Sequence, residues 1–227
     1  MTAPHLRVGL IGYGYAGRTF HAPLIAGVPG LSLAAVSSRD PARVQADLPR
    51  AEVCASPQAL LAREDLDLVV IASPNDSHYP LARAALAAGH HVVVDKPFTL
   101  TLAEARELGA LAHARQRLLA VFHNRRWDGD FLTLRALVAD GTLGRPVHLE
   151  SAFDRYRPAV RTRWRESAQP GAGLWFDLGP HLLDQALLAV AARLHQGRFR
   201  ERALQGPVGP FGIEVGGLAR ILEDGWV

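Results

Sequence analysis

A glycine-rich turn near the start of the sequence sets what the rest of the chain can fold into. An apolar run from Val8 to Ile11 leads into Gly-Tyr-Gly-Tyr-Ala-Gly, residues 12–17, and a helix-like pattern follows. In such a G-x-G-x-x-G turn, the three glycines permit a tight turn, close approach of a pyrophosphate, and close packing of helix on strand. Free N–H groups at the helix start attract phosphate. The turn therefore predicts a dinucleotide site, with a plain glycine-rich turn as the alternative.

Short apolar runs then alternate with helix-like segments, which is typical of an α/β fold. Strands are predicted at residues 7–11, 31–36, 51–55, 67–72, 91–94 and 118–122, and helices at about 16–26, 57–63, 79–88 and 101–115. We therefore expect a nucleotide-binding, doubly wound parallel sheet over residues 1–122. The remainder, 123–227, predicts a helix at about 130–140 and a strand at 147–153, which make an incomplete α+β second domain.

The end of the second strand bears on the choice of cofactor. NAD-binding proteins usually place an acidic residue about 20 residues past the glycine turn, where it binds the ribose 2′-hydroxyl. Here the chain reads Ser38-Arg39-Asp40, and a guanidinium suits a 2′-phosphate. This predicts NADP(H) in preference to NAD(H), with Arg43 as a second cation. Asp40 either caps the next helix or is itself the ribose ligand.

Lysine usage points to one position. The chain has 25 lysines and arginines, and only Lys96 is a lysine. An amine can release a proton when it is buried, whereas a guanidinium cannot. Lys96 follows the strand at 91–94, so it lies at the carboxyl edge of the sheet, where ligands bind in open α/β folds. The alternative is chance, because a chain that uses arginine almost throughout can retain one lysine at any position.

A second group of polar residues lies at Asp177 and His181. The two residues are four apart and share a face if the turn between them is helical. A carboxylate beside an imidazole orients the ring and raises its pKa. Pro180 suits the first turn of a helix. From spacing alone, the preferred interpretation is an aspartate cap followed by an exposed histidine.

In this order, the motifs resemble the Gfo/Idh/MocA family of NAD(P)-dependent oxidoreductases. The resemblance runs from residue 6 to about 187. It rests on the glycine turn, Ser-Pro-Asn-Asp-Ser-His at 73–78, Asp-Lys-Pro at 95–97 where the family commonly has Glu-Lys-Pro, His-Asn-Arg-Arg-Trp-Asp at 123–128, and Gly-Ala-Gly at 171–173 followed by Asp-Leu-Gly-Pro-His-Leu-Leu-Asp at 177–184. It implies a Rossmann domain and hydride transfer between nicotinamide C4 and a sugar, cyclitol or related polyol or carbonyl substrate.

The resemblance also assigns residues. Lys96, Asp177 and His181 fall on the family's catalytic positions, with His181 exchanging a proton with the substrate oxygen and Lys96 stabilising charge on it. Together with the glycine-turn and ribose arguments, it gives the expected cofactor residues Gly12, Gly14, Tyr15, Ala16, Gly17, Ser38, Arg39, Arg43, Ser73, Asn75, His78, Asp95, Lys96 and Pro97. The residues expected on the substrate side are Lys96, Asn124, Arg125, Arg126, Arg163, Trp164, Asp177 and His181. For the arginines and Trp164, ordinary surface and core positions are the alternative.

After about Leu188 the chain departs from the family pattern. Family members are usually much longer, and most of their second-domain sheet has no counterpart here. The expectation is a truncated or frame-shifted chain, or a partner chain that covers the strand at 147–153. Because family members often dimerise through this sheet, homo-oligomer formation stays open. The alternative function is a non-catalytic NADP(H)-binding remnant or cofactor-responsive binding module.

Composition argues against several other classes. The net charge of +3 comes from arginines interleaved with acids, without a basic run, so no nucleic-acid partner is expected. No apolar run is long enough for a bilayer and no signal sequence is evident, which predicts a cytoplasmic chain with no membrane partner. The single cysteine, Cys54, excludes an internal disulfide and predicts a buried thiol. The histidines lack clustered metal-ligand spacing, so no metal is expected.

Overall fold

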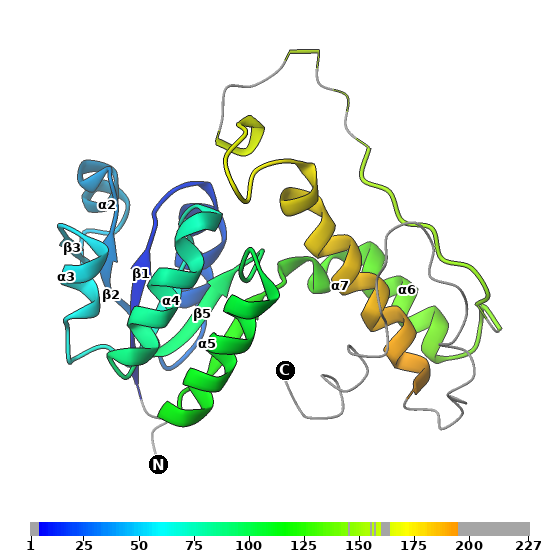
Figure 1. Ribbon diagram of the computed structural model, residues 1–227, viewed down its shortest axis with the longest axis horizontal. Coiled ribbons are helices and arrows are strands. Elements are labelled where there is room, and N and C mark those ends of the chain that lie inside the picture. The colour runs from blue at the N-terminus through cyan, green and yellow to red at the C-terminus, as the bar shows by residue number, and fades with distance from the viewer. Residues whose placement is uncertain (1–4, 145, 155, 157, 160–163, 195–227) are drawn as a thin grey trace. The chain divides into compact units, whose positions relative to one another are not determined.

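The computed structural model describes residues 5–144, 146–154, 156, 158–159 and 164–194. They divide into two compact units (Figure 1). The first unit holds the residues up to His123 together with Phe153–Pro180, and the second holds Asn124–Ala152 and the residues from His181 onward. The sequence-based division after residue 122 places 153–180 in the second domain, whereas the structure groups this segment with the first unit.

The first unit is built on one parallel sheet of six strands. The strands are β1 (Leu6–Ile11), β2 (Leu31–Ser37), β3 (Glu52–Cys54), β4 (Leu68–Ile71), β5 (His91–Asp95) and β6 (Leu119–Phe122). Their order across the sheet is β3-β2-β1-β4-β5-β6, and every neighbouring pair is parallel. The predicted doubly wound sheet is therefore confirmed, with strand ends within two residues of those expected. The order reverses between β1 and β4, which is the position at which such folds bind ligands.

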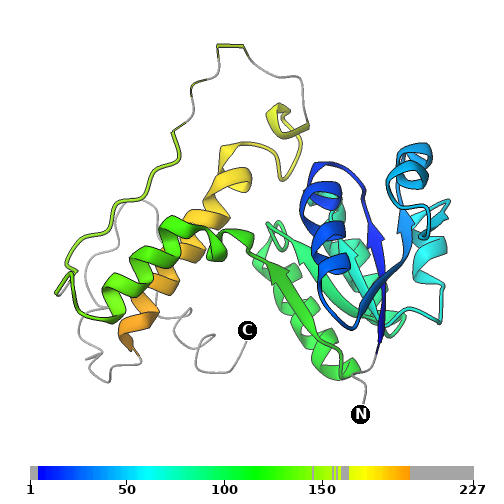
Figure 2. The same ribbon diagram turned by 180° about the vertical axis from the view of Figure 1, so that it is seen from behind.

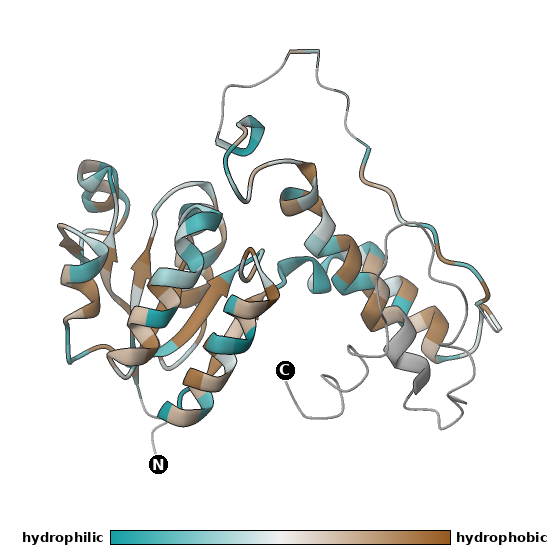
Figure 3. Cartoon of the chain, in the orientation of Figure 1, coloured by the Kyte–Doolittle hydropathy of each residue, from teal (hydrophilic) through white to brown (hydrophobic). Residues whose placement is uncertain are grey.

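Helices cover both faces of this sheet (Figures 1 and 2). On one face, α3 (Pro57–Leu61), α4 (His78–Ala87) and α5 (Leu102–Arg115) enclose a core that includes Ile71 and Leu86. On the other face, α1 (Ala22–Gly27) and α2 (Pro41–Asp47) enclose a core that includes Leu10 and Val36. Successive strand residues point to opposite faces, so strands buried on both faces are mostly apolar, and much of the sheet is brown in Figure 3.

Local side-chain contacts explain where the helices begin. The Thr101 hydroxyl accepts a hydrogen bond from the Glu104 N–H at 3.2 Å, and the Glu104 carboxylate accepts one from the Thr101 N–H at 3.0 Å. This is a capping box at the start of α5. Ser56 caps α3 in the simpler way, by accepting from the Ala59 N–H at 3.1 Å. Helix entry is thus encoded locally in the sequence.

All the regular secondary structure described in the second unit is helical. It contains a short 3₁₀ helix at Asn124–Trp127, the helix α6 (Gly129–Ala139) and the later part of α7 (Leu174–Leu194). The strand expected at 147–153 is wrong, because residues 146–154 have no regular secondary structure. No seventh strand is found among the described residues to pair with it, and an isolated strand cannot satisfy its backbone groups. The first-turn position expected for Pro180 is also wrong, since α7 begins at Leu174 and Pro180 lies inside it.

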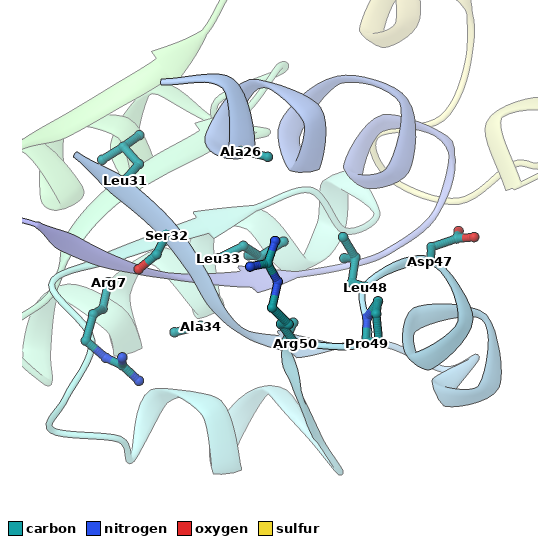
Figure 4. Close-up of a pocket in the computed structure, with 11 residues that line it drawn as sticks. Arg7, Ala26, Leu31, Ser32, Leu33, Ala34, Asp47, Leu48, Pro49 and Arg50 are labelled. Carbon is teal, nitrogen blue, oxygen red and sulfur yellow. The ribbon is translucent and has the colours of Figure 1, made fainter. Parts of the chain in front are cut away.

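A pocket beside β2 lies away from the ligand-binding edge (Figure 4). Its lining includes Leu31, Ser32, Leu33, Ala34 and Arg50. The pairing of β3 with β2 starts only at Ala35, so the amino-terminal half of β2 has no strand on that side in the described structure. This pocket is therefore a consequence of the short β3. Within the described segments, no helix is long and apolar enough to cross a membrane.

Candidate active site

The glycine turn has the geometry that its sequence predicts. Gly12 has a φ of +97°, and a Cβ there would lie 2.6 Å from the carbonyl oxygen of Ala72, which follows β4. A Cβ on Gly17 would overlap the carbonyl oxygen of Gly12. The Gly12 N–H donates to the Ser37 carbonyl at 2.9 Å, which joins the turn to the end of β2. Gly12 and Gly17 are therefore explained by the fold itself.

Gly14 is different, because the fold does not require a glycine there. A Cβ on Gly14 would meet no protein atom within 4 Å. The Arg18 N–H donates to the Gly14 carbonyl at 3.0 Å, so the N–H groups of Tyr15, Ala16 and Gly17 precede the first hydrogen bond of the helical segment. A glycine with open space at the start of a helix suits the close approach of a pyrophosphate. The turn therefore fits a dinucleotide cofactor.

The residues beyond β2 distinguish the two roles considered for Asp40. Its Oδ1 accepts from the Arg43 N–H at 3.1 Å, and its Oδ2 lies 3.2 Å from Nη2 of Arg43. The interpretation of Asp40 as a helix cap is confirmed. The Ser38 hydroxyl oxygen accepts from the Asp40 N–H at 3.1 Å, while Arg39 is exposed. Asp40 and Arg43 are thus engaged with each other, and Arg39 is the cation open to a ligand.

The loop after β4 is held by contacts inside the protein. Nδ2 of Asn75 donates to the Gly171 carbonyl oxygen at 2.8 Å, and Asn75 is buried. The Ser73 and Ser77 hydroxyl oxygens lie 2.6 Å apart. A Cβ on Gly171 would lie 3.1 Å from the Asn75 Cβ, so the two backbones approach closely. The predicted cofactor residues Ser73 and Asn75 thus use their polar atoms to order this loop and to tie it to the segment before α7.

His78 connects this loop to the one after β5. Its Nδ1 lies 2.7 Å from the Pro97 carbonyl oxygen, and its Nε2 lies 2.9 Å from the Ser73 carbonyl oxygen. Burial lowers the pKa of His78, and the two carbonyl oxygens act against this lowering. A neutral imidazole can donate to one of the two oxygens only. His78, expected to bind cofactor, is 1% exposed, and both of its ring nitrogens contact backbone carbonyl oxygens of the two loops.

Lys96 and Asp177 are brought together in the first unit. Nζ of Lys96 donates to the Asp177 carbonyl oxygen at 2.6 Å and lies 3.4 Å from its Oδ1. The Lys96 side chain is 11% exposed. Burial lowers the pKa of the Lys96 ammonium; Asp177 and Asp95 act to raise it, and Arg165 acts to lower it. Lys96 follows β5 and the glycine turn follows β1, so both lie at the carboxyl edge of the sheet.

Arg165 is a residue of this group that the sequence did not single out. Its Nε lies 3.2 Å from Oδ1 of Asp177, the oxygen that also faces Lys96. Its guanidinium stacks over the Trp164 ring, 4.6 Å from the ring centroid. Twelve positions separate Arg165 from Asp177, and no periodicity relates two residues at that distance in different elements. In the sequence, the basic character of residues 155–165 is the only feature that points to Arg165.

Asp95 lies beside Lys96 and has its own neighbours. Its Oδ1 accepts from the Lys96 N–H at 3.0 Å and is 4.0 Å from Nε2 of His21. His21 is 4% exposed, packs on the Phe122 ring with centroids 4.4 Å apart, and belongs to a π-helical segment at Gly17–His21. Burial lowers the pKa of His21, and Asp95 acts to raise it. A buried histidine from the segment after the glycine turn thus faces a carboxylate at the end of β5.

The residues predicted for the substrate side have varied positions. Arg126 makes a two-pronged ion pair with Asp184 of α7, at 2.9 and 2.7 Å, and Arg125 pairs with Asp128 at 2.8 Å. These ion pairs favour a structural role for both arginines over a role in binding substrate. Asn124 begins the 3₁₀ helix that carries them, and Trp164 is half-buried in the first unit. Arg163 lies outside the described residues.

His181 belongs to the second unit, where it is buried. The condition for Asp177 and His181 to share a helical face is met, because both lie in α7. Asp177 is in the first turn of that helix rather than at its cap, and His181 is not exposed, so the interpretation from spacing alone is wrong on both points. The catalytic role of His181 stays a prediction.

Comparison with known proteins places this arrangement in a family. The oxidoreductase family described as having an NAD-binding Rossmann fold matches residues 6–123, and the GFO/IDH/MocA C-terminal domain matches residues 131–196. The uncharacterized oxidoreductase YdgJ of Escherichia coli is 62% identical over 183 residues, which cover 81% of this chain and 53% of YdgJ. The Bacillus subtilis scyllo-inositol 2-dehydrogenase (NADP(+)) IolW is 37% identical over 182 residues, covering 80% of this chain and 51% of IolW.

A solved structure agrees with these relatives. The YPO2259 protein of Yersinia pestis aligns with a TM-score of 0.76 at 60% identity, covering 82% of this chain and 52% of that one. The chain thus spans about half the length of the relatives it matches. The sheet order, the glycine turn and the family match over both segments lead to one assignment. The chain belongs to the Gfo/Idh/MocA family of NAD(P)-dependent oxidoreductases.

Proposed function

We propose that this chain forms the cofactor and proton-handling part of an NADP(H)-preferring oxidoreductase that acts on a CH–OH group of a sugar, cyclitol or related polyol. The observation that carries the proposal is the contact between Lys96 and Asp177 at the carboxyl edge of the sheet. The IolW relative, described as an inositol dehydrogenase, supports the substrate class. The bound cofactor would accept or supply the hydride.

The residues present would hold such a cofactor by their backbone and by Arg39. The N–H groups of Tyr15, Ala16 and Gly17 precede the first hydrogen bond of the helical segment and follow Gly14, which leaves open space, so they would bind a pyrophosphate. Arg39 is exposed at the end of β2, where a 2′-phosphate would lie. Asp40 caps α2 and contacts Arg43, which supports NADP(H) over NAD(H) because this carboxylate is already used.

Lys96 would act on the substrate oxygen. An ammonium with three donors can keep its bond to the Asp177 carbonyl and still donate to an alkoxide or carbonyl oxygen. Such a donor stabilises negative charge on that oxygen and makes hydroxyl deprotonation easier. A lowered pKa makes the ammonium a better proton donor at neutral pH. His181 is proposed as the group that exchanges the proton, as the family resemblance implies.

A non-catalytic NADP(H)-binding module is the second candidate. It needs only the cofactor residues. Arg125 and Arg126, which were expected on the substrate side, form ion pairs with Asp128 and Asp184 within the second unit, and this favours the second candidate. Binding and turnover must therefore be tested separately.

The test is a fluorescence titration of the full chain with NADPH and NADH, followed by turnover with inositol and sugar substrates. We expect tighter binding of NADPH, and loss of turnover in Lys96→Met with binding retained. The matched control Arg115→Met changes one exposed cation at the end of α5 and should affect neither. Equal binding of both cofactors would contradict the Arg39 assignment, and binding without turnover in the unaltered chain would favour the second candidate.

A further inference from the structure

The carboxylate of Asp177 lies between two cations. Its Oδ1 is 3.4 Å from Nζ of Lys96 and 3.2 Å from Nε of Arg165. Of these three side chains, Lys96 is the most buried at 11% exposed, Asp177 is 26% exposed and Arg165 is 35% exposed. One carboxylate oxygen of Asp177 is therefore shared by the ammonium of Lys96 and the guanidinium of Arg165.

Arg165 is also attached to the start of α7 through its backbone. Its carbonyl oxygen accepts from the Gly173 N–H at 2.8 Å, and the Gly173 carbonyl accepts from the Asp177 N–H at 3.1 Å. Stacking on Trp164 restricts the guanidinium to one direction. Arg165 is thus connected to Asp177 twice: its side chain pairs with the carboxylate, and its backbone is linked to the Asp177 backbone through Gly173.

We propose that Arg165 is a positioning residue for the Lys96–Asp177 pair: it fixes the Asp177 carboxylate through the shared oxygen and keeps that carboxylate from serving Lys96 alone. Among the described residues, the charged groups that act on Lys96 are Asp177, Asp95 and Arg165, and the buried His78 contacts the carbonyl oxygen of the neighbouring Pro97. In this set, Arg165 acts against the two carboxylates, so the Lys96 ammonium releases its proton more readily.

In the proposed function, this arrangement makes Lys96 a stronger donor to the substrate oxygen. That consequence rests on the proposed function, but the placement of Arg165 does not. The chain offers a direct test, because Lys96 is its only lysine. An amine-selective acylating reagent reacts only with the neutral amine, here at Lys96 and at the chain's α-amino group.

The experiment measures acylation of Lys96 in the full chain from pH 6 to 11, with mass spectrometry of the peptide that carries it. The midpoint of the rate profile reports proton release from Lys96, and the plateau at high pH reports access of the reagent. In Arg165→Gln we expect the midpoint to move to higher pH with the same plateau. At a fixed pH below the midpoint, the rate should fall by roughly two- to fivefold, as for a partly exposed charge pair.

Three further variants sharpen the result. Arg165→Met keeps a long side chain along Trp164 without charge and should shift the midpoint in the same direction. Asp177→Asn should move it to lower pH, and the effect of Arg165→Gln should shrink in that background because the shared carboxylate is gone. Arg83→Gln removes an exposed guanidinium that pairs with Glu107 on α5, and should leave the profile unchanged.

An unmoved midpoint in Arg165→Gln and Arg165→Met would overturn the proposal. A raised plateau would also overturn it, because Arg165 would then only keep the segment closed over Lys96. The assay needs neither cofactor nor turnover. A shifted midpoint in a chain that fails to bind NADPH would therefore uphold the role of Arg165 while rejecting the proposed function.

Discussion

At the scale of single residues, the structure gives Asn75 and His78 a part in holding the fold, while their cofactor contacts stay a prediction. Both were predicted to bind cofactor, yet their polar atoms face carbonyl oxygens of Gly171, Pro97 and Ser73. Their residue types are informative in the sequence, because buried amides and imidazoles need partners. The partners themselves are 19 and 96 positions away for Pro97 and Gly171. Sequence can therefore flag such residues, while their contacts come only from the fold.

For Asn75, we predict a cost in stability rather than a direct loss of a cofactor contact. Asn75→Ala leaves the buried Gly171 carbonyl without its donor, which costs about 1–3 kcal/mol in the free energy of unfolding. Denaturant unfolding monitored by circular dichroism measures this. The neighbouring exposed residue supplies the control, since Asp76→Ala should stay within about 0.5 kcal/mol. Weaker NADPH binding with unchanged stability would instead support a direct cofactor contact.

At the scale of elements, the sequence predicts most of what is local. The strand runs, the capping box at Thr101 and the caps at Ser56 and Asp40 depend on neighbours within a few residues. The strand expected at 147–153 depends on a partner strand, and alternation of residues says nothing about whether one exists. Pro180 was assigned to a first turn because proline is common there, but the helix starts six residues earlier.

The glycine turn yields a prediction that separates folding from binding. Gly14→Ala should leave the free energy of unfolding within about 1 kcal/mol of the unaltered chain, because the added methyl meets no protein atom. It should weaken NADPH binding about tenfold or more, because the methyl lies where the pyrophosphate approaches.

Gly17→Ala is the contrasting variant. Its methyl overlaps the Gly12 carbonyl oxygen, so it should destabilise the chain by about 1–3 kcal/mol. Fluorescence titration and thermal unfolding of both variants measure the two effects. If Gly14→Ala bound NADPH normally, the pyrophosphate would not lie at this turn.

At the scale of the whole molecule, two buried histidines lie close to the candidate site. His21 packs on the Phe122 ring at the end of β6, and His78 joins the loops after β4 and β5. Burial lowers the pKa of both side chains. The folded chain therefore holds them neutral at a pH at which the unfolded chain, with histidine pKa values near 6.5, already takes up protons.

The sign of the pH dependence follows from this difference. The stabilisation that comes from keeping these two histidines neutral is fully present above about pH 6.5. It is lost as the pH falls from there through the lowered pKa values of the folded chain, by up to about 1.4 kcal/mol per pH unit for each histidine. Carboxylates act in another range. Arg63, with Arg7, holds the pKa of Asp65 at about 2, so its contribution is lost only in stronger acid. The interval from pH 7 to 5 therefore reports mainly on the buried histidines.

We predict that the free energy of unfolding decreases between pH 7 and pH 5, and that His21→Leu reduces this slope. Denaturant unfolding at a series of pH values measures the slope directly. His113→Gln is the control, because His113 is exposed on α5 and should leave the slope unchanged. An unchanged slope in His21→Leu would contradict the prediction, and a steeper slope would mean that His21 takes up its proton more readily in the folded chain, with Asp95 as its partner. In that case a charged His21–Asp95 pair would join the end of the helical segment that follows the glycine turn to the end of β5.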